Sequence, residues 1–209
     1  MRTARSYATL EQLRRPVVTT REASVAWGLD PSATTHALTR LAEVSLVKRL
    51  RQGVWQIGSG TLDPLLVLPV LTQPYPSHVS MWSALFGHGM IEQIPRSVYA
   101  VSLGRARSVR TEAGEFRIHH VTPDLYGGAE GGTSLRAGTA TPEKALFDTV
   151  YLLSARSGTV SLPELELPDG FDATKEWWWV DRIPADRLRT MVSRKLDRIL
   201  ASATGRPTA

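Results

Sequence analysis

Apolar side chains recur at helical spacing at the start of the chain. This spacing predicts a helix over residues 4–14, and Pro16 ends it because proline cannot donate a further backbone hydrogen bond. Thr19 and Glu22 have the spacing of a capping box, in which each side chain bonds the backbone of the other residue. We therefore predict a second, short helix after Thr19, which Gly28 ends in the left-handed conformation.

A third helix and a hairpin are predicted to follow. Asp30 is a favourable N-cap, and Pro31 fits the first helical position, where its missing N–H leaves no bond unmade. This helix is expected to reach about Val44. Its buried stripe is formed by Ala37, Leu38, Leu41 and Ala42. Residues 46–57 then form two β-prone runs around a turn that contains Gly53. Three helices followed by a hairpin are the element order of a winged helix-turn-helix, a DNA-binding fold.

Beyond residue 57 the pattern becomes mixed. Residues 58–64 have the composition of a linker, so we predict an α+β protein with two domains. These are an N-terminal winged helix-turn-helix domain over residues 1–60 and a mixed α/β C-terminal domain over residues 61–209. The elements expected in the second domain are a helix over 78–88, strands over 97–103, 116–121 and 135–139, a helix from Pro142 capped by Thr141, and a last helix over 184–201. A loop between the first two strands carries Arg105, Arg107 and Arg110.

Charge is distributed unevenly between the two predicted domains. The chain has a formal net charge of +5, and residues 1–57 hold nine basic and four acidic side chains, so the whole excess lies in the first quarter. Such asymmetry indicates an acidic partner for this part, either nucleic acid or a membrane surface. A solvated basic surface without a partner is the simpler alternative. The predicted element order favours double-stranded DNA.

The third helix of a winged helix-turn-helix enters the major groove, so we expect base contacts from the residues opposite its buried stripe. Arg40 can donate two hydrogen bonds to a guanine edge, whereas the hairpin tip would lie along the phosphate backbone or in the minor groove. The residues expected to contact DNA are Arg21, Ser32, Thr35, His36, Thr39, Arg40, Lys48, Arg49, Arg51 and Gln52.

The sequence offers no catalytic constellation, and we expect no enzyme activity, no cofactor and no metal. The chain has no cysteine, which excludes disulfides, thiolate ligands and thiol nucleophiles and fits a reducing cytoplasm. His119 and His120 are neighbours in a predicted strand, so they face opposite sides and cannot share a metal ion. Residues 127–132 lack the spacing of a phosphate-binding loop and are interpreted as a flexible loop.

Two further runs have simple interpretations. Residues 177–179 are three tryptophans, which we interpret as a half-buried strand before the last helix, with a stacking platform for bases as the alternative. The basic face of the last helix is interpreted as a solvated stripe. The chain has no run of 18 or more apolar residues, so we expect no membrane span and a protein of the cytoplasm.

Three segments resemble the AbiEi-type antitoxins of type IV toxin–antitoxin (abortive infection) systems. The first joins residues 30–42 to residues 46–55, the second covers residues 78–95, and the third is the motif Thr141-Pro-Glu-Lys-Ala-Leu-Phe-Asp148. The first segment occurs in many regulators, so the second and third carry the resemblance. Ser45 and Trp55 stand where we would expect glycine and tyrosine.

The resemblance implies a DNA-binding repressor of its own operon that also neutralises a co-encoded nucleotidyltransferase-like toxin through its second domain. Direct contact with the toxin and opposition to its effect are both compatible with the sequence. A homodimer on DNA is expected if the operator is two-fold symmetric. Two alternatives stay open: a plain transcriptional regulator whose second domain senses a ligand or mediates dimerisation, and an enzyme on nucleic acid that the first domain targets.

Overall fold

The computed structural model describes residues 3–156, 162 and 165–203. Its helices are α1 (Thr3–Gln12), α2 (Thr20–Trp27), α3 (Pro31–Glu43), α4 (Pro64–Thr72), α5 (Met81–Gly87), α6 (Pro142–Ala155), α7 (Ala173–Val180) and α8 (Asp186–Ala203), with a 3-10 turn at Pro123–Leu125. Its strands are β1 (Val17–Thr19), β2 (Val47–Arg51), β3 (Val54–Ile57), β4 (Ser77–Val79), β5 (Val98–Ser102), β6 (Arg107–Thr111), β7 (Gly114–His120), β8 (Ala129–Glu130) and β9 (Gly138–Ala140). The fold is mixed α+β with two sheets.

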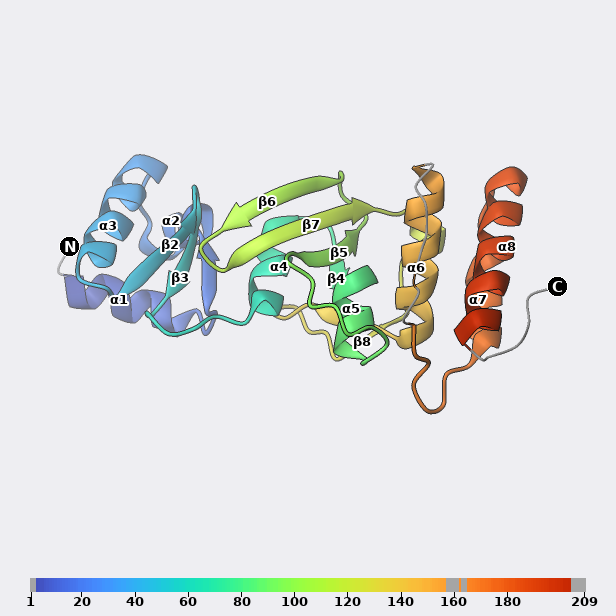
Figure 1. The fold of residues 1–209 in the computed structure, drawn as a ribbon. Coiled ribbons are helices and arrows are strands. Elements are labelled where there is room, and N and C mark those ends of the chain that lie inside the picture. The colour runs from blue at the N-terminus through green and yellow to red at the C-terminus, as the bar shows by residue number, and fades with distance from the viewer. Residues whose placement is uncertain (1–2, 157–161, 163–164, 204–209) are drawn as a thin grey trace.

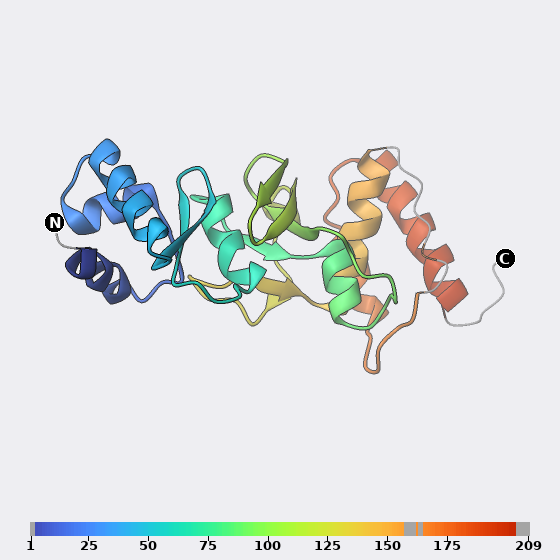
Figure 2. The same cartoon turned by 60° about the vertical axis from the view of Figure 1, so that its left-hand side comes forward.

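These elements follow one long axis. Figure 1 shows α1 to β3 at one end, the larger sheet in the middle and α6, α7 and α8 at the other end. The same order holds in the turned view of Figure 2. The N-terminal elements are therefore presented at a free end of the molecule.

Local signals place the N-terminal helices where the sequence predicted them. The Thr19 hydroxyl accepts the Glu22 backbone N–H at 3.1 Å, and the Thr19 N–H donates to the Glu22 carboxylate at 2.7 Å. Gly28 ends α2 with a φ of 63°, and Asp30 caps α3 by accepting the Ser32 backbone N–H at 2.9 Å. The predicted capping box, glycine stop and N-cap are confirmed.

A small antiparallel sheet of order β1-β3-β2 completes the N-terminal part. Trp55 joins this sheet to α2 by donating its indole N–H to the Thr20 hydroxyl, and Trp27 joins α2 to α1 by donating to the Ser6 carbonyl, both at 3.0 Å. Ser45 connects α3 to β2 with a φ of 57°, in the left-handed region that favours glycine. The structure thus explains why glycine is expected at that position.

The larger sheet has six strands in the order β6-β7-β5-β4-β9-β8. The β5–β7 and β4–β9 pairs are parallel and the other pairs are antiparallel. Its two faces bury different clusters. Phe116 and Ile118 of β7 pack with α4 residues Val67 and Leu68 on one face. On the other face Val101 of β5 packs with α5, α6, α7 and α8.

The N-terminal sheet is docked on the larger one. Val17, Leu50 and Val54 belong to the same apolar cluster as α4 and β7. The Glu112 backbone N–H, in the turn between β6 and β7, donates to the Leu50 carbonyl at 3.0 Å. Asp63 caps α4, so the predicted linker ends at residue 63 instead of 64. The β2–β3 hairpin is therefore held against the second part of the chain.

The prediction of one helix over residues 78–88 is wrong at its start. His78 and Val79 belong to β4, and α5 begins only after Ser80. Val79 lies opposite Ala100 on one side and Thr139 on the other, so pairing with two distant strands overrides the local helical spacing. The strand expected over residues 135–139 is the shorter β9, which begins at Gly138.

Two other assignments are also wrong. Arg107 and Arg110 lie in β6, not in a loop, because β6 pairs with β7 along its whole length. The tryptophan run forms part of helix α7 and not a strand. Asp172 caps this helix, and Trp179 is buried with its ring 6.0 Å from the ring of Phe147. Packing against α6 thus decides the conformation of the run.

Candidate nucleic-acid interface

Helix α3 exposes the side that the sequence predicted. Ala37, Leu38 and Leu41 are buried in the N-terminal core, and this burial fixes the rotation of the helix. The five residues of the opposite side are all exposed, namely Ser32, Thr35, His36, Thr39 and Arg40. The Thr35 and Thr39 hydroxyls donate within the helix to the carbonyls four residues earlier, at 2.8 and 2.9 Å. Their oxygen lone pairs remain able to accept a further hydrogen bond.

The hairpin residues are exposed beside α3. They are Lys48, Arg49, Arg51 and Gln52. The Arg49 guanidinium lies 5.6 Å from the centre of the Trp55 ring, an arrangement that orients a cation while leaving it in solvent. Lys48 lies 4.0 Å from a Glu112 carboxylate oxygen, so part of its charge is balanced by the second part of the chain.

Nine of the ten predicted contacts therefore lie on α3 or the hairpin, and Arg21 of α2 is exposed as well. Arg21 lines a separate hollow of about 510 Å³, together with Leu13, Val25 and Gln73. Val25 is 79% exposed, an unusual fraction for a valine beside a hollow. The structure thus brings α3 and the hairpin together and gives Arg21 different neighbours.

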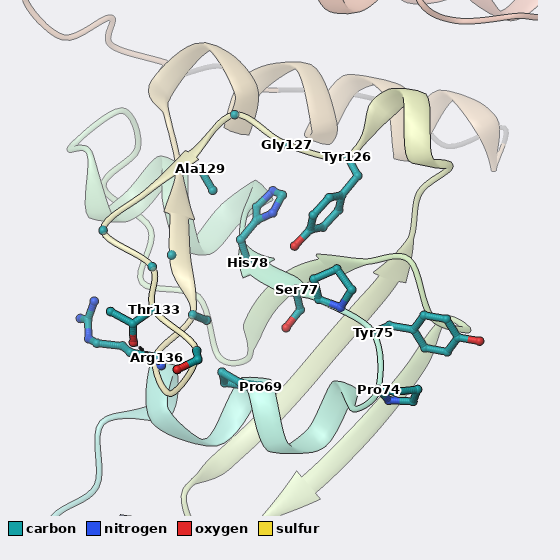
Figure 3. Close-up of a pocket in the computed structure, with 17 residues that line it drawn as sticks. Pro69, Pro74, Tyr75, Ser77, His78, Tyr126, Gly127, Ala129, Thr133 and Arg136 are labelled. Carbon is teal, nitrogen blue, oxygen red and sulfur yellow. Dashed lines mark hydrogen bonds between the residues drawn. The ribbon is translucent and has the colours of Figure 1, made fainter. Parts of the chain in front are cut away.

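A cavity of about 600 Å³ lies away from this surface, between α4 and the glycine-rich residues 127–132 (Figure 3). His78 and Tyr126 lie side by side near one end of it, with ring centres 5.0 Å apart. Thr133 and Arg136 lie at the other end. The cavity therefore combines aromatic, hydroxyl and cationic groups around a backbone-rich wall.

Close packing explains the glycines of this wall. A Cβ at Gly128 would come within 2.9 Å of the Lys144 and Trp179 side chains, and one at Gly138 within 2.7 Å of the Glu130 carbonyl oxygen. Gly128 also has a φ of 67°, which favours glycine. The interpretation of residues 127–132 as a flexible loop is wrong in part, because Ala129 and Glu130 form β8 and pair with β9. Contact with Lys144 of α6 and Trp179 of α7 explains the glycine at position 128.

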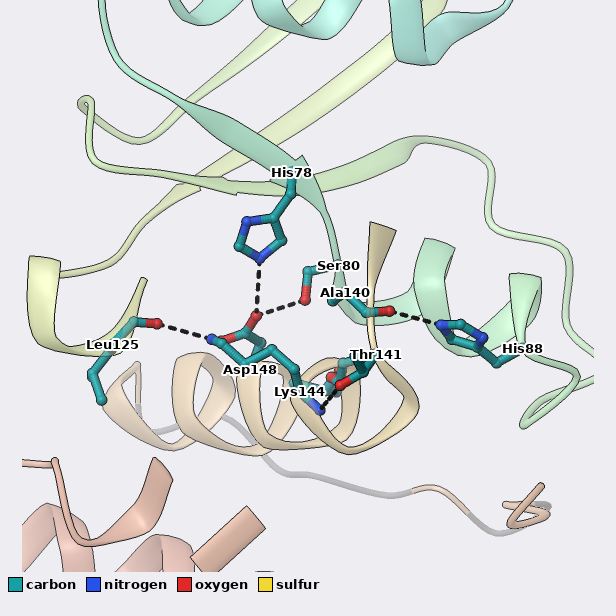
Figure 4. Close-up of polar contacts among 10 residues, drawn as sticks. His78, Ser80, His88, Leu125, Ala140, Thr141, Lys144 and Asp148 are labelled. Carbon is teal, nitrogen blue, oxygen red and sulfur yellow. Dashed lines mark hydrogen bonds and ion pairs between the residues drawn. The ribbon is translucent and has the colours of Figure 1, made fainter. Parts of the chain in front are cut away.

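A buried polar network connects β4 to α6 (Figure 4). The Asp148 carboxylate accepts hydrogen bonds from Lys144 and, at 2.6 Å, from the Ser80 hydroxyl. The Lys144 ammonium also donates to the Leu125 carbonyl at 2.9 Å. His78 Nε2 lies 4.0 Å from the same carboxylate. All four side chains of the network are almost completely inaccessible to solvent.

Burial shifts the ionisation of this network. It lowers the pKa of Lys144 and raises the pKa of Asp148, and their mutual attraction opposes both shifts. Burial, helped by the Lys144 charge, lowers the pKa of His78 to about 3, so this imidazole is neutral at physiological pH. His78 borders the cavity of about 600 Å³, whereas Ser80, Lys144 and Asp148 do not line it, which fits a structural role for the ion pair better than a catalytic one. Sequence reasoning missed the network, although Lys144 and Asp148 stand four apart in one helix, the spacing that places two side chains on the same face.

Glu176 of α7 is a second buried acid. Neither of its carboxylate oxygens has a hydrogen-bond partner in the described part of the chain. Burial, with a smaller contribution from the Glu143 charge, raises its pKa from 4.5 to about 9. The side chain is therefore protonated and neutral near pH 7.

We expect Glu176 to make the fold less stable in alkali. Because the pKa of Glu176 is raised in the folded state, its stabilising contribution to the free energy of unfolding is complete below pH 4.5. This contribution is lost as the pH rises towards about 9. Over that range this group should lower the free energy of unfolding by up to about 1.4 kcal/mol per pH unit. Urea unfolding between about pH 7 and 9 should show a shallower decline for Glu176→Gln. The exposed Glu166→Gln serves as the control, and parallel curves for wild type and Glu176→Gln would contradict the expectation.

Metal-binding clusters, membrane-spanning helices and similarity to known proteins also bear on what this chain does. In residues 3–156, 162 and 165–203 no three metal-binding side chains come together in a way that could hold an ion. No helix among these residues has the length and apolar character needed to cross a bilayer. Comparison of the chain with models of known protein families finds no match, and comparison with curated proteins finds none either.

Proposed function

We propose that α1 to β3 form a winged helix-turn-helix that binds double-stranded DNA. The observation that carries this proposal is the common exposure of Ser32, Thr35, Thr39 and Arg40 on α3 next to the exposed hairpin cations. In this proposal α3 enters the major groove and the hairpin contacts the phosphate backbone. The end of the molecule that carries α3 is free of the second part of the chain, so a duplex can approach it (Figure 2).

Electrostatics supports the same partner. The +5 charge of the chain is equal to the excess within residues 1–57, and the ten predicted contacts include five cations. Cations on a surface that fits the duplex release the counterions of the phosphates, which supplies most of the sequence-independent affinity. A surface of this kind fits a membrane poorly, because Ser32, Thr35, His36, Thr39 and Gln52 are polar and the exposed Val44 at the end of α3 is too small to form an apolar face.

We further propose that the chain is an antitoxin of the type IV toxin–antitoxin class, acting in the cytoplasm as a repressor of its own operon. Support comes from the two segments that carry the AbiEi resemblance. His78 and Ser80 of the second segment lie against Lys144 and Asp148 of the third in one buried network. The two segments thus belong to a single structural unit, as we expect if they were retained together in one family. The proposed partner is a co-encoded nucleotidyltransferase-like toxin.

A plain transcriptional regulator with a ligand-sensing second domain is the second candidate. The cavity of about 600 Å³ favours it, because α4 contributes Pro69 to the cavity wall and also packs against β1 of the N-terminal part. A ligand in this cavity would contact an element that supports the DNA-binding module. The same cavity gives no reason for a toxin partner.

Co-expression separates the two candidates. The gene adjacent to this one is expressed alone, with the full-length protein, and with a full-length Arg40→Ala/Arg51→Ala variant. If the chain is an antitoxin, the adjacent gene should be toxic when it is expressed alone. The wild-type protein and the variant should both protect against it, and only the variant should fail to repress the promoter. Substitutions are preferable to deletion of residues 1–60, because deletion would expose the cluster that Leu50 and Val54 share with Phe116.

Two outcomes would overturn the antitoxin proposal. A harmless neighbouring gene would leave the plain regulator as the better account. Loss of protection by a variant that remains folded, as judged by its thermal unfolding, would show that protection does not reside in the second domain. Binding of the purified wild-type protein to its own promoter DNA tests the DNA-binding proposal separately.

A further inference from the structure

Four arginines that are distant in the sequence line one groove. Two hollows of about 310 and 400 Å³ meet there, and Trp82, Tyr99 and Arg117 line both of them. The walls come from α5, the segment between α5 and β5, the strands β5, β6 and β7, and the end of α6. We call this site the arginine groove and define it by Trp82, Tyr99, Arg96, Arg107, Arg117 and Arg156.

The groove carries an excess of positive charge. None of its lining residues in the described part of the chain is acidic. Arg117 lies 3.5 Å from a Glu115 carboxylate oxygen outside the lining, and Arg107 donates to the Leu71 carbonyl. Arg96 and Arg156 have no carboxylate within ion-pair distance among the described residues. The Arg107 guanidinium is thus turned towards α4, and the positive charge of the groove comes from Arg96, Arg117 and Arg156, which a bound anion would balance.

His119 lines the basic half of the groove. Both of its ring nitrogens are buried, and neither has a partner in the part of the chain that the structure describes. Burial and the charges of Arg156 and Arg117 lower its pKa to about 4, so the ring is neutral and can donate one hydrogen bond and accept another. Because both nitrogens have almost no accessible surface, a ligand in the hollow would meet this ring as a neutral part of the wall beside Arg117 and Arg156.

The other half of the groove is apolar and aromatic. Trp82 and Tyr99 are half-buried there, and Ile94 is 73% exposed, which is unusual for a large aliphatic side chain. The Arg117 guanidinium lies 5.8 Å from the centre of the Tyr99 ring, at the boundary between the two halves. Aromatic faces of this kind bind flat rings, and base–aromatic stacking tolerates any base.

We propose that the arginine groove binds a nucleotide, with its phosphates on Arg117 and Arg156 and its base against Trp82, Ile94 and Tyr99. Guanidinium groups bind phosphate oxygens through paired hydrogen bonds, so two of them beside one hollow match a phosphate chain. A duplex would not use the aromatic half, because its bases are stacked and paired. The proposal does not depend on the DNA-binding or the antitoxin function, since α3 contributes no residue to this groove.

Binding of ATP, GTP, CTP and UTP to the full-length protein, measured by isothermal titration calorimetry, tests the proposal. At least one of them should bind saturably, and Arg117→Ala and Arg156→Ala should each weaken it roughly ten- to hundredfold. Arg187→Ala, at an exposed position of α8, is the matched control and should leave the affinity unchanged. Tyr99→Leu should lower the affinity for the nucleotide but not the affinity for inorganic triphosphate, which lacks a base.

Three results would overturn the proposal. One is the absence of saturable binding by any of these nucleotides to a folded wild-type protein. Another is equal affinity for nucleotide and inorganic triphosphate with no effect of Tyr99→Leu, which would reduce the groove to a phosphate site. The third is that Arg117→Ala and Arg156→Ala both weaken promoter binding but leave the nucleotide affinity unchanged. The groove would then be an additional DNA-binding surface. Thermal unfolding of each variant shows whether the comparison is made on folded protein.

Discussion

Lys144→Met is expected to lower the free energy of unfolding by about 3–5 kcal/mol, the largest effect we predict for a single substitution. The Asp148 carboxylate would lose its cation in a site without solvent and would keep only the Ser80 hydroxyl as a close partner. The methionine can follow the path of the lysine stem, so the loss would come mainly from the uncompensated charge. Urea unfolding at neutral pH measures the change.

A second substitution distinguishes charge from packing. Lys144→Met/Asp148→Asn removes both charges, and the asparagine side-chain oxygen can still accept the hydrogen bond from the Ser80 hydroxyl, so most of the lost stability should return. Lys175→Met is the matched control, because this lysine pairs with Glu143 at 3.3 Å but is 59% exposed and should contribute little. A double variant no more stable than Lys144→Met would mean that packing, and not charge, explains the loss.

Arg40→Ala and Arg51→Ala should weaken promoter binding in different ways. If Arg40 makes a paired contact with a base, its loss should cost roughly 1–3 kcal/mol and should relax discrimination at one base pair. If Arg51 contacts a phosphate, its loss should weaken binding to every sequence and should reduce the slope of affinity against salt concentration by about one unit. Titrations of promoter and scrambled DNA at several salt concentrations measure both effects.

Arg187→Ala serves again as the control, because it removes one exposed cation far from α3. Equal losses on promoter and scrambled DNA for Arg40→Ala would make Arg40 a phosphate contact. An affinity that does not change with salt for the wild-type protein would contradict binding through the hairpin cations altogether.

Sequence reasoning succeeded at the N-terminal elements for a local reason. The bond between Thr19 and Glu22, the left-handed Gly28 and the cap at Asp30 all involve residues within four positions of one another. Such interactions form wherever the chain carries those residues in that order. The exposure of Thr35 and Arg40 follows from the same periodicity once the opposite stripe is buried.

Assignments that depend on distant partners failed. His78 and Val79 form a strand because Ala100 and Gly138 lie beside them, and residues that far along the chain leave no trace in local spacing. Trp177 to Trp179 are helical because Trp179 packs on α6, which again is a contact between separate elements. The local pattern at these positions was compatible with more than one structure.

By itself the sequence determined the α3 surface, its charge and the order of the N-terminal elements, because each follows from neighbours along one helix or one turn. The tertiary structure alone decided the docking of the hairpin on β6 and β7, the buried network around Asp148, and the arginine groove. Arg96, Arg117 and Arg156 belong to a stretch without net charge, and only strand pairing and helix packing place them along one groove. The interaction between charges depends on the distance between them in space. A count of charges along the sequence does not contain that distance.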